Sequence, residues 1–225
     1  RWLMDALEST RFVAHLAIML MPVMLLSQII EAMTITVMPA TSAYEATGNQ
    51  LMLQELLIRG MRYTMILSLV GLVAAGLFIK DALNIWVGPD YVFLAPYALV
   101  LFAARTFMLI SSTAQQMLKG IGKLREVMFI YLIGFVILPI GMIIVIFAAW
   151  HDPYVAVTAG LSIGYVICGC LQTGFCSKAV NADLHAVLKR AYVQPLILAV
   201  PVGFASLCAI NFFQFNGLFA RIIIF

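Results

Sequence analysis

The stretch VMFIYLIGFVILPIGMIIVIFAAW, residues 127–150, decides the fold of this chain. It runs for 24 residues without a charged side chain. A helix that crosses the hydrocarbon core of a bilayer needs about 20 mainly apolar residues, because each residue adds only about 1.5 Å along the axis. The stretch is therefore predicted to be a membrane-spanning helix.

Five other stretches have the same apolar character and similar lengths: residues 12–38, 63–79, 92–118, 154–177 and 192–213. The sequence thus predicts an all-α, polytopic bundle of about six transmembrane helices. Residues 1–11 are expected to be the end of a preceding helix or an outer loop. Residues 214–225 are expected to begin a further, truncated span, so the chain reads as a piece of a longer protein.

Composition agrees with a membrane location. The 225 residues are 64% hydrophobic and 10% charged, with a mean hydropathy of +1.06. Soluble domains have about 45–50% apolar and about 25% charged residues. The formal charge of +3 does not indicate a nucleic-acid partner, because in membrane proteins the positions of Lys and Arg matter more than their sum.

The positions of the basic residues predict an orientation. The links after the first, third and fifth stretches carry eight of them: Arg59, Arg62, Lys119, Lys123, Arg125, Lys178, Lys189 and Arg190. The opposite side has four: Arg1, Arg11, Lys80 and Arg221. Under the positive-inside rule, the first group is cytoplasmic. Trp86 and Tyr91 flank one of the opposite links, where aromatic side chains favour the membrane interface.

Small residues predict where helices pack closely. Ala156, Gly160, Gly164 and Cys168 recur at every fourth position. Such spacing forms a groove that lets a neighbouring backbone approach. Pro139, inside the stretch 127–150, is expected to bend its helix because it lacks a backbone donor.

Two charged residues lie well inside apolar stretches, Glu31 in the first and Arg105 in the third. A formal charge within hydrocarbon costs at least about 2.5–3.5 kcal/mol, so such residues usually face a protein interior or a watery cavity. Ser27 and Thr34 share the helical face of Glu31, and Gln28 lies beside it.

A second polar stripe is formed by Arg105, Ser112 and Gln116. Both stripes are expected to face the bundle interior or a cavity.

The path for a polar substrate or ion is accordingly predicted to involve Glu31, Arg105, Gln28 and Ser27. A guanidinium suits phosphate oxygens, whereas a carboxylate suits a proton or cation, or positions an arginine. The alternative for both charges is a structural role, in which they pair with partners in this chain or elsewhere in the protein.

The sequence contains no constellation typical of an enzyme. It has no GxSxG, P-loop or HExxH motif. None of its four cysteines forms a CxxC pair, and no histidine lies near them at a spacing typical of metal ligands. We therefore expect no catalytic residues, no metal site and no cofactor.

Three links carry a family resemblance. The first stretch leads into VMPATSAY at 37–44 and ATGN at 46–49, the second into NIWVGPDY at 84–91, and the third into QMLKGIGK at 116–123. In order and spacing, this series resembles the polysaccharide-export, or lipid-linked oligosaccharide flippase, branch of the MOP (multidrug/oligosaccharidyl-lipid/polysaccharide) superfamily.

The resemblance implies the C-terminal lobe of a two-lobed transporter in the cell inner membrane, residues 12–213. Its substrate would be a glycan linked to undecaprenyl pyrophosphate, moved by alternating access with H⁺ or Na⁺ coupling as an option. Membrane lipids are the other expected partner. A cation-coupled multidrug antiporter of the same superfamily is one alternative, and a non-transporting membrane scaffold of an envelope-synthesis complex is another.

Overall fold

The computed structural model describes residues 2–150, 152–193 and 197, and within these residues every regular element is a helix. The α-helices are α1 (Trp2–Thr34), α2 (Val37–Ala46), α3 (Gln50–Trp86), α4 (Ala95–Ile110), α5 (Ser112–Gly120), α6 (Leu124–Tyr131), α7 (Leu138–Trp150), α8 (Pro153–Ala179) and α9 (Leu184–Leu188). A 3₁₀ segment, Pro89–Leu94, precedes α4, and π-helical segments occupy Leu132–Ile137 and Lys189–Val193.

Five stretches are long and apolar enough to cross a membrane: Thr10–Ala46, Gln50–Trp86, Pro89–Gly120, Leu124–Ile144 and Pro153–Ala179. They match the first five predicted spans, so the all-α, multi-pass fold is confirmed. The predicted sixth span, 192–213, lies almost wholly outside the described residues, as do residues 214–225. Residues 2–11, expected as the end of a preceding helix or a loop, continue the same helix as the first span.

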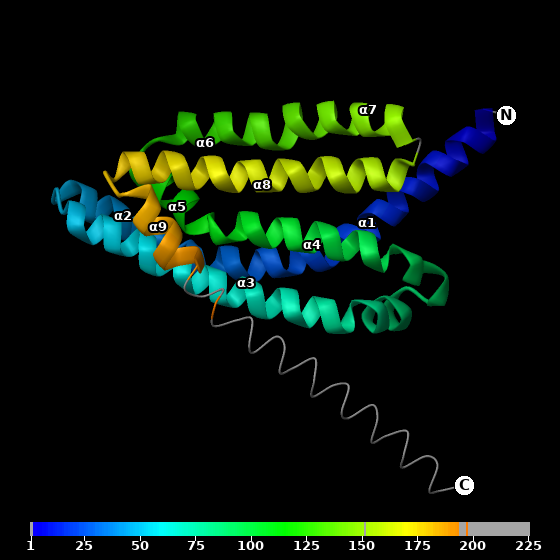
Figure 1. The fold of residues 1–225 in the computed structure, drawn as a ribbon, viewed down its shortest axis with the longest axis horizontal. Helices are drawn as coiled ribbons and strands as arrows, with labels where there is room; N and C mark the ends of the chain where they lie inside the picture. Colours follow the sequence, from blue (N-terminus) through cyan, green and yellow to red (C-terminus); the bar gives the residue numbers. More distant parts are fainter. Residues whose placement is uncertain (1, 151, 194–196, 198–225) are drawn as a thin grey trace, which may run out of the picture.

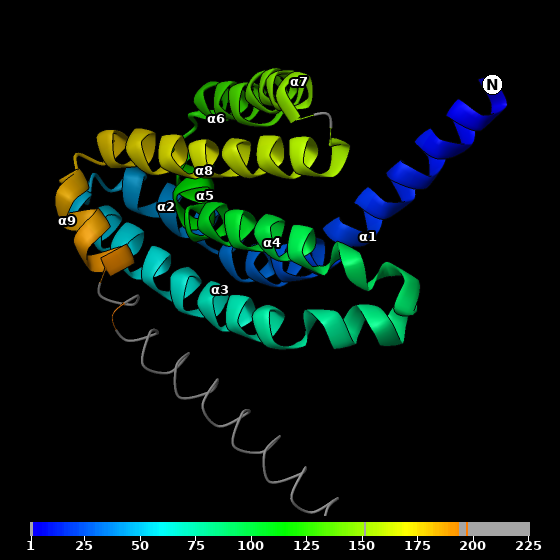
Figure 2. The same cartoon turned by 45° about the vertical axis from the view of Figure 1, so that its right-hand side comes forward.

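The spans form layers, with α8 between the α6–α7 pair on one side and α4 on the other (Figures 1 and 2). Helices α1 and α3 pack against the opposite side of α4. The N-terminal part of α1 projects away from the bundle in both views. α1 is therefore an edge helix, whereas α4 and α8 are interior helices.

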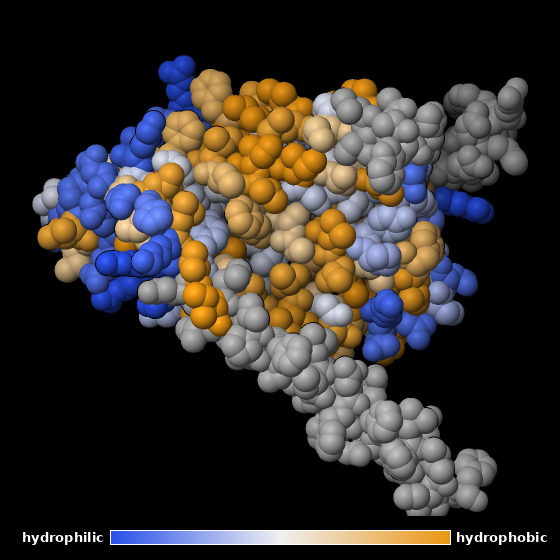
Figure 3. Space-filling view, viewed as in Figure 1, coloured by the Kyte–Doolittle hydropathy of each residue, from blue (hydrophilic) through white to orange (hydrophobic). Residues whose placement is uncertain are grey.

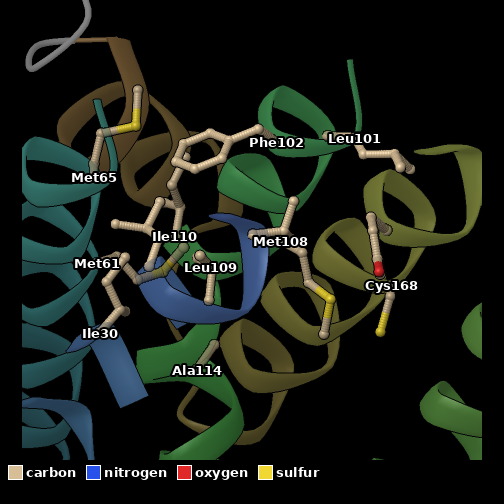
Figure 4. Packing of buried hydrophobic residues seen from close by; sticks show 14 of the residues in the cluster. Ile30, Met61, Met65, Leu101, Phe102, Met108, Leu109, Ile110, Ala114 and Cys168 are labelled. Carbon is tan, nitrogen blue, oxygen red and sulfur yellow. The ribbon is translucent and has the colours of Figure 1, made fainter. Parts of the chain in front are cut away.

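The core consists mainly of aliphatic side chains and methionines from α1, α3, α4, α5 and α8. Ile30, Met61, Leu101 and Met117 are fully buried in it. Figure 4 shows how these helices converge around α4. Methionine fills irregular gaps because its side chain is unbranched and flexible.

The outer surface is apolar around the middle of the bundle and polar at its ends (Figure 3). Exposed apolar side chains include Leu25, Ile29, Val70, Met128 and Ile144. A water-soluble protein rarely exposes so continuous an apolar surface. Such a belt fits contact with lipid tails, in agreement with a multi-pass membrane protein.

α3 is much longer than the predicted span at 63–79. Its 37 residues extend about 55 Å, whereas a bilayer core is about 30 Å thick. Its N-terminal part packs with α2 in a helical hairpin at the polar end of the bundle, which we define by the turns at 47–49, 121–123 and 180–183. There, Gln54 Nε2 donates to the carbonyls of Val180 and Asn181, at 3.2 and 2.9 Å, just beyond the C-terminus of α8.

The predicted small-residue groove on α8 is where α8 packs against α6 and α7. A Cβ atom on Gly164 would lie 2.3 Å from the carbonyl oxygen of Gly134 and 2.7 Å from Cγ of Pro139. Pro139 has no N–H to bond the carbonyl four residues earlier, and the π-helical segment Leu132–Ile137 ends just before it. The irregular backbone of one span thus rests on the glycine face of another.

Gly164→Ala is expected to lower the free energy of unfolding by about 1–3 kcal/mol, because the contacting atom is backbone and cannot move aside cheaply. Gly174→Ala on the same helix is the matched control. Nothing lies within 4 Å of a Cβ built there, and alanine favours helices over glycine by about 0.5–1 kcal/mol. Unfolding of the purified protein in detergent measures both values, and equal effects would contradict the close approach.

The orientation is testable with two exposed acidic residues, Glu45 in α2 and Asp90 in the 3₁₀ segment before α4. These two elements lie at opposite ends of the bundle (Figure 1). In a cysteine-free background, we expect a membrane-impermeant maleimide to label Asp90→Cys in intact cells. Glu45→Cys should react only after the cells are permeabilised, because the basic residues gather at its end. The reverse pattern would show that the positive-inside assignment is wrong.

Candidate functional site

Arg105 lies near the middle of the third span, on interior helix α4, and its side chain is only 16% exposed. Nε donates to Ser27 Oγ at 3.0 Å, and Nη1 contacts Met108 Sδ at 3.2 Å. Cζ lies 5.3 Å from the ring centroid of Tyr165, in a cation–π contact. The guanidinium is therefore held by groups from α1, α4 and α8 at once.

The remaining nitrogen of the fork faces Glu31. Arg105 Nη2 donates to Glu31 Oε1 at 3.4 Å, a single long contact rather than a bidentate pair. The Glu31 side chain is 56% exposed. The pair is thus asymmetric: its cation is enclosed by the bundle, and its anion stands at the surface.

The two charged groups open into a groove of about 330 Å³ between α1, α4 and α8. The groove is lined by Leu20, Val23, Met24, Ser27, Gln28, Glu31, Arg105 and Tyr165. Its apolar members come mainly from α1, whose outer surface continues it with exposed Met21 and Leu25. A polar spot thus lies within an apolar surface at membrane depth.

All four residues predicted for the substrate or ion path line this one groove. Ser27 is buried and Gln28 exposed, and the Ser27 hydroxyl donates to the Val23 carbonyl while accepting from Arg105. Thr34, predicted on the same stripe, instead lines a second cavity of about 360 Å³ toward α3. The residues of the first polar stripe therefore line two different cavities.

The second predicted stripe is divided by a break in its helix. α4 ends at Ile110, and α5 begins at Ser112. Ser112 is buried as expected and Gln116 is half-buried, but neither lines the groove of Arg105. The break frees the Ile110 carbonyl, and Thr64 Oγ1 donates to it at 3.0 Å.

Two polar residues of α8 escape the sequence analysis because their polar stripe is hidden in a small-residue pattern. Tyr165 stacks on Arg105, and buried Gln172 accepts a hydrogen bond from Ser111 Oγ at 2.8 Å. Tyr165 and Gln172 are seven residues apart and so share a face of α8. That spacing is a signal in the sequence, but the glycine repeat on the same helix obscures it.

The arrangement offers ionic contacts but no reactive group. Among the described residues, no group of three or more His, Cys, Asp or Glu side chains could hold a metal ion. The site provides one guanidinium, one carboxylate and the polar side chains of Ser27 and Gln28. It can therefore bind an anion or a cation reversibly.

His15 has a structural environment near the middle of α1, about four turns before Glu31. Its Nδ1 lies 2.7 Å from the Tyr154 hydroxyl, and its ring meets Tyr91 and Phe93 edge-on. These contacts join α1 to the segment before α4 and to the start of α8. They fit an interfacial, hydrogen-bonded histidine.

Comparison with known proteins gives no relative. No family model matches the chain, and no curated protein or solved structure matches it.

Ser27→Ala should test how Arg105 is held. The substitution removes the acceptor of Nε in a largely buried guanidinium, so we expect a loss of about 1–3 kcal/mol in the free energy of unfolding. Gln28→Ala changes the exposed neighbour on the same helix and should stay within about 0.5 kcal/mol of the wild type. Equal effects, measured by unfolding in detergent, would show that the Ser27–Arg105 bond does not stabilise the fold.

Proposed function

We propose that this chain is part of a membrane transporter that flips a lipid-linked oligosaccharide or polysaccharide precursor across the cell inner membrane by alternating access. The observation that supports it best is the groove that contains Glu31 and Arg105. Polar side chains at membrane depth that face lipid would be costly, so such groups usually serve a polar cavity. Here one charge stays exposed on the side of an apolar bundle, which suits a translocation path.

Two of the three linking segments that suggested the flippase family also meet in space. Ser42, in the first of these segments, donates from Oγ to the carbonyl of Gly120 in the third, at 2.9 Å. A Cβ on Gly120 would lie 2.7 Å from the Met38 carbonyl oxygen, so glycine permits this close approach. Residues of these two segments therefore share a structural role at the polar end of the bundle.

The resemblance also implies where α1 would lie in the complete transporter. In the proposed two-lobed transporter, the exposed side of this edge helix borders a central cavity, and the second lobe faces it. The exposed methionines Met21 and Met24 would then line a deformable apolar wall beside the charged groups. A wall of this kind suits a substrate with a lipid tail and a polar head.

The exposed carboxylate also favours a second candidate function. If Glu31 binds a proton or an organic cation, the protein is a cation-coupled multidrug antiporter, and Arg105 only positions the carboxylate. The two functions differ in which of the paired charges contacts the substrate.

Transport by the full-length protein in proteoliposomes tests the proposal. We expect translocation of a labelled lipid-linked sugar, slowed about ten-fold or more by Glu31→Gln and by Arg105→Lys. Such a loss corresponds to one charge-assisted contact of about 1.5–3 kcal/mol. Glu55→Gln is the matched control, since Glu55 forms an exposed pair with Arg59 on α3, outside the groove.

Wild-type rates in both groove variants would refute the proposed path. Transport of an organic cation without transport of the sugar would establish the antiporter. Transport of neither the sugar nor the cation would favour the remaining alternative, a non-transporting membrane scaffold.

A further inference from the structure

Arg105 presents its three nitrogens very unequally. Nε and Nη1 are engaged by Ser27 and Met108, and Tyr165 covers one side of the guanidinium. The third nitrogen, Nη2, contacts the carboxylate of Glu31, and both side chains line the groove. The bundle thus fixes the cation and leaves one donor edge available to a ligand.

Glu31 is a weakly held occupant of that edge. Its contact with Nη2 is 3.4 Å long, beyond the 2.7–2.9 Å typical of a strong charge-assisted bond, and its side chain is 56% exposed. The carboxylate can therefore give up this contact when a stronger anion takes its place on the enclosed guanidinium.

We propose that Arg105 is an ion-exchange site, at which Glu31 and the diphosphate of a lipid-linked substrate alternate as the bound anion. The inference rests on the proposed function and specifies how that site recognises its substrate. Phosphate oxygens accept strong charge-assisted hydrogen bonds from a guanidinium and carry more charge than one carboxylate. They can therefore displace Glu31 when they enter the groove.

The volume and charge of the groove agree with this exchange. About 330 Å³ is far above the roughly 10–15 Å³ that one water molecule needs, so a phosphate group has room beside the guanidinium. Glu31 and Arg105 are the charged side chains among the lining residues, and α8 contributes the neutral phenol of Tyr165. With Glu31 on Arg105, the groove is neutral, and with Glu31 displaced, it offers a positive site.

Exchange would also provide a way to release the substrate. A fixed, unopposed guanidinium would hold a diphosphate tightly and slow its departure. The return of Glu31 to Nη2 restores a partner for the buried cation as the phosphate leaves. Glu31 then acts as a positioning and release group, and Arg105 is the group that touches the substrate.

Binding of inorganic pyrophosphate to the purified full-length protein tests the exchange directly. Glu31→Gln should tighten the pyrophosphate Kd by about three- to ten-fold, the equivalent of removing one partly exposed competing charge. Because Glu31 is exposed, this substitution should leave the fold intact. Glu55→Gln removes a carboxylate from the exposed Glu55–Arg59 pair and should leave the Kd unchanged.

An unchanged or weaker Kd in Glu31→Gln would overturn the exchange, and so would equal tightening in Glu55→Gln, which would indicate a general charge effect. Arg105→Lys keeps the charge but loses the fork, and should weaken binding in the Glu31→Gln background about ten-fold. Retained affinity there would place the anion elsewhere.

Competition separates the two sources of phosphate in a membrane. Undecaprenyl pyrophosphate should displace pyrophosphate from Glu31→Gln, whereas phosphatidylglycerol at the same concentration should not. Equal displacement would overturn the assignment to a diphosphate-linked substrate.

The exchange and the proposed function can fail separately. If the wild type moves the lipid-linked sugar but Glu31→Gln binds pyrophosphate no better, the flippase stands without the exchange. If neither the wild type nor the variants move the sugar, the proposed function fails whatever the binding shows.

Discussion

The need to satisfy backbone polar groups and charges within the protein shapes this molecule, because a bilayer core offers no water to do so. The guanidinium of Arg105 shows the constraint most clearly, since a serine, a methionine, a tyrosine and a glutamate from three helices surround it. The interrupted helices obey the same rule. Where the third span breaks after Ile110, the freed carbonyl receives the hydroxyl of Thr64 from another helix.

Close backbone packing around α8 makes these contacts possible. Gly160 and Gly164 admit the backbone near Pro139, and Gly169 faces the backbone of Phe107 and Met108 on α4. In a membrane, helices associate through such packing rather than through exclusion of water. Because α8 touches neighbours on both sides, it fixes Tyr165 over Arg105 and fixes the third span against the rest of the bundle.

Much of this fold was predictable from local pattern. Five apolar stretches became spans, the small-residue repeat on α8 became a packing surface, and the four predicted path residues line one groove. The full length of α3 was not predicted, because charged residues interrupt its apolar run on both sides of 63–79: Glu55, Arg59 and Arg62 before it, and Lys80 and Asp81 after it. The break at Ser111 was also missed, since serine is tolerated within helices and one of the partners of its hydroxyl, Gln172, lies 61 residues later.

The sequence by itself determined that the chain is helical and spans a membrane several times, because length and apolarity alone settle where backbone can lie in a bilayer. It also determined that Glu31 and Arg105 must find polar surroundings. The tertiary structure decided that they find each other, and that the cation is enclosed while the anion is exposed. That difference depends on which helix is interior and which lies at the edge, a property of packing between residues 74 positions apart that no local pattern encodes.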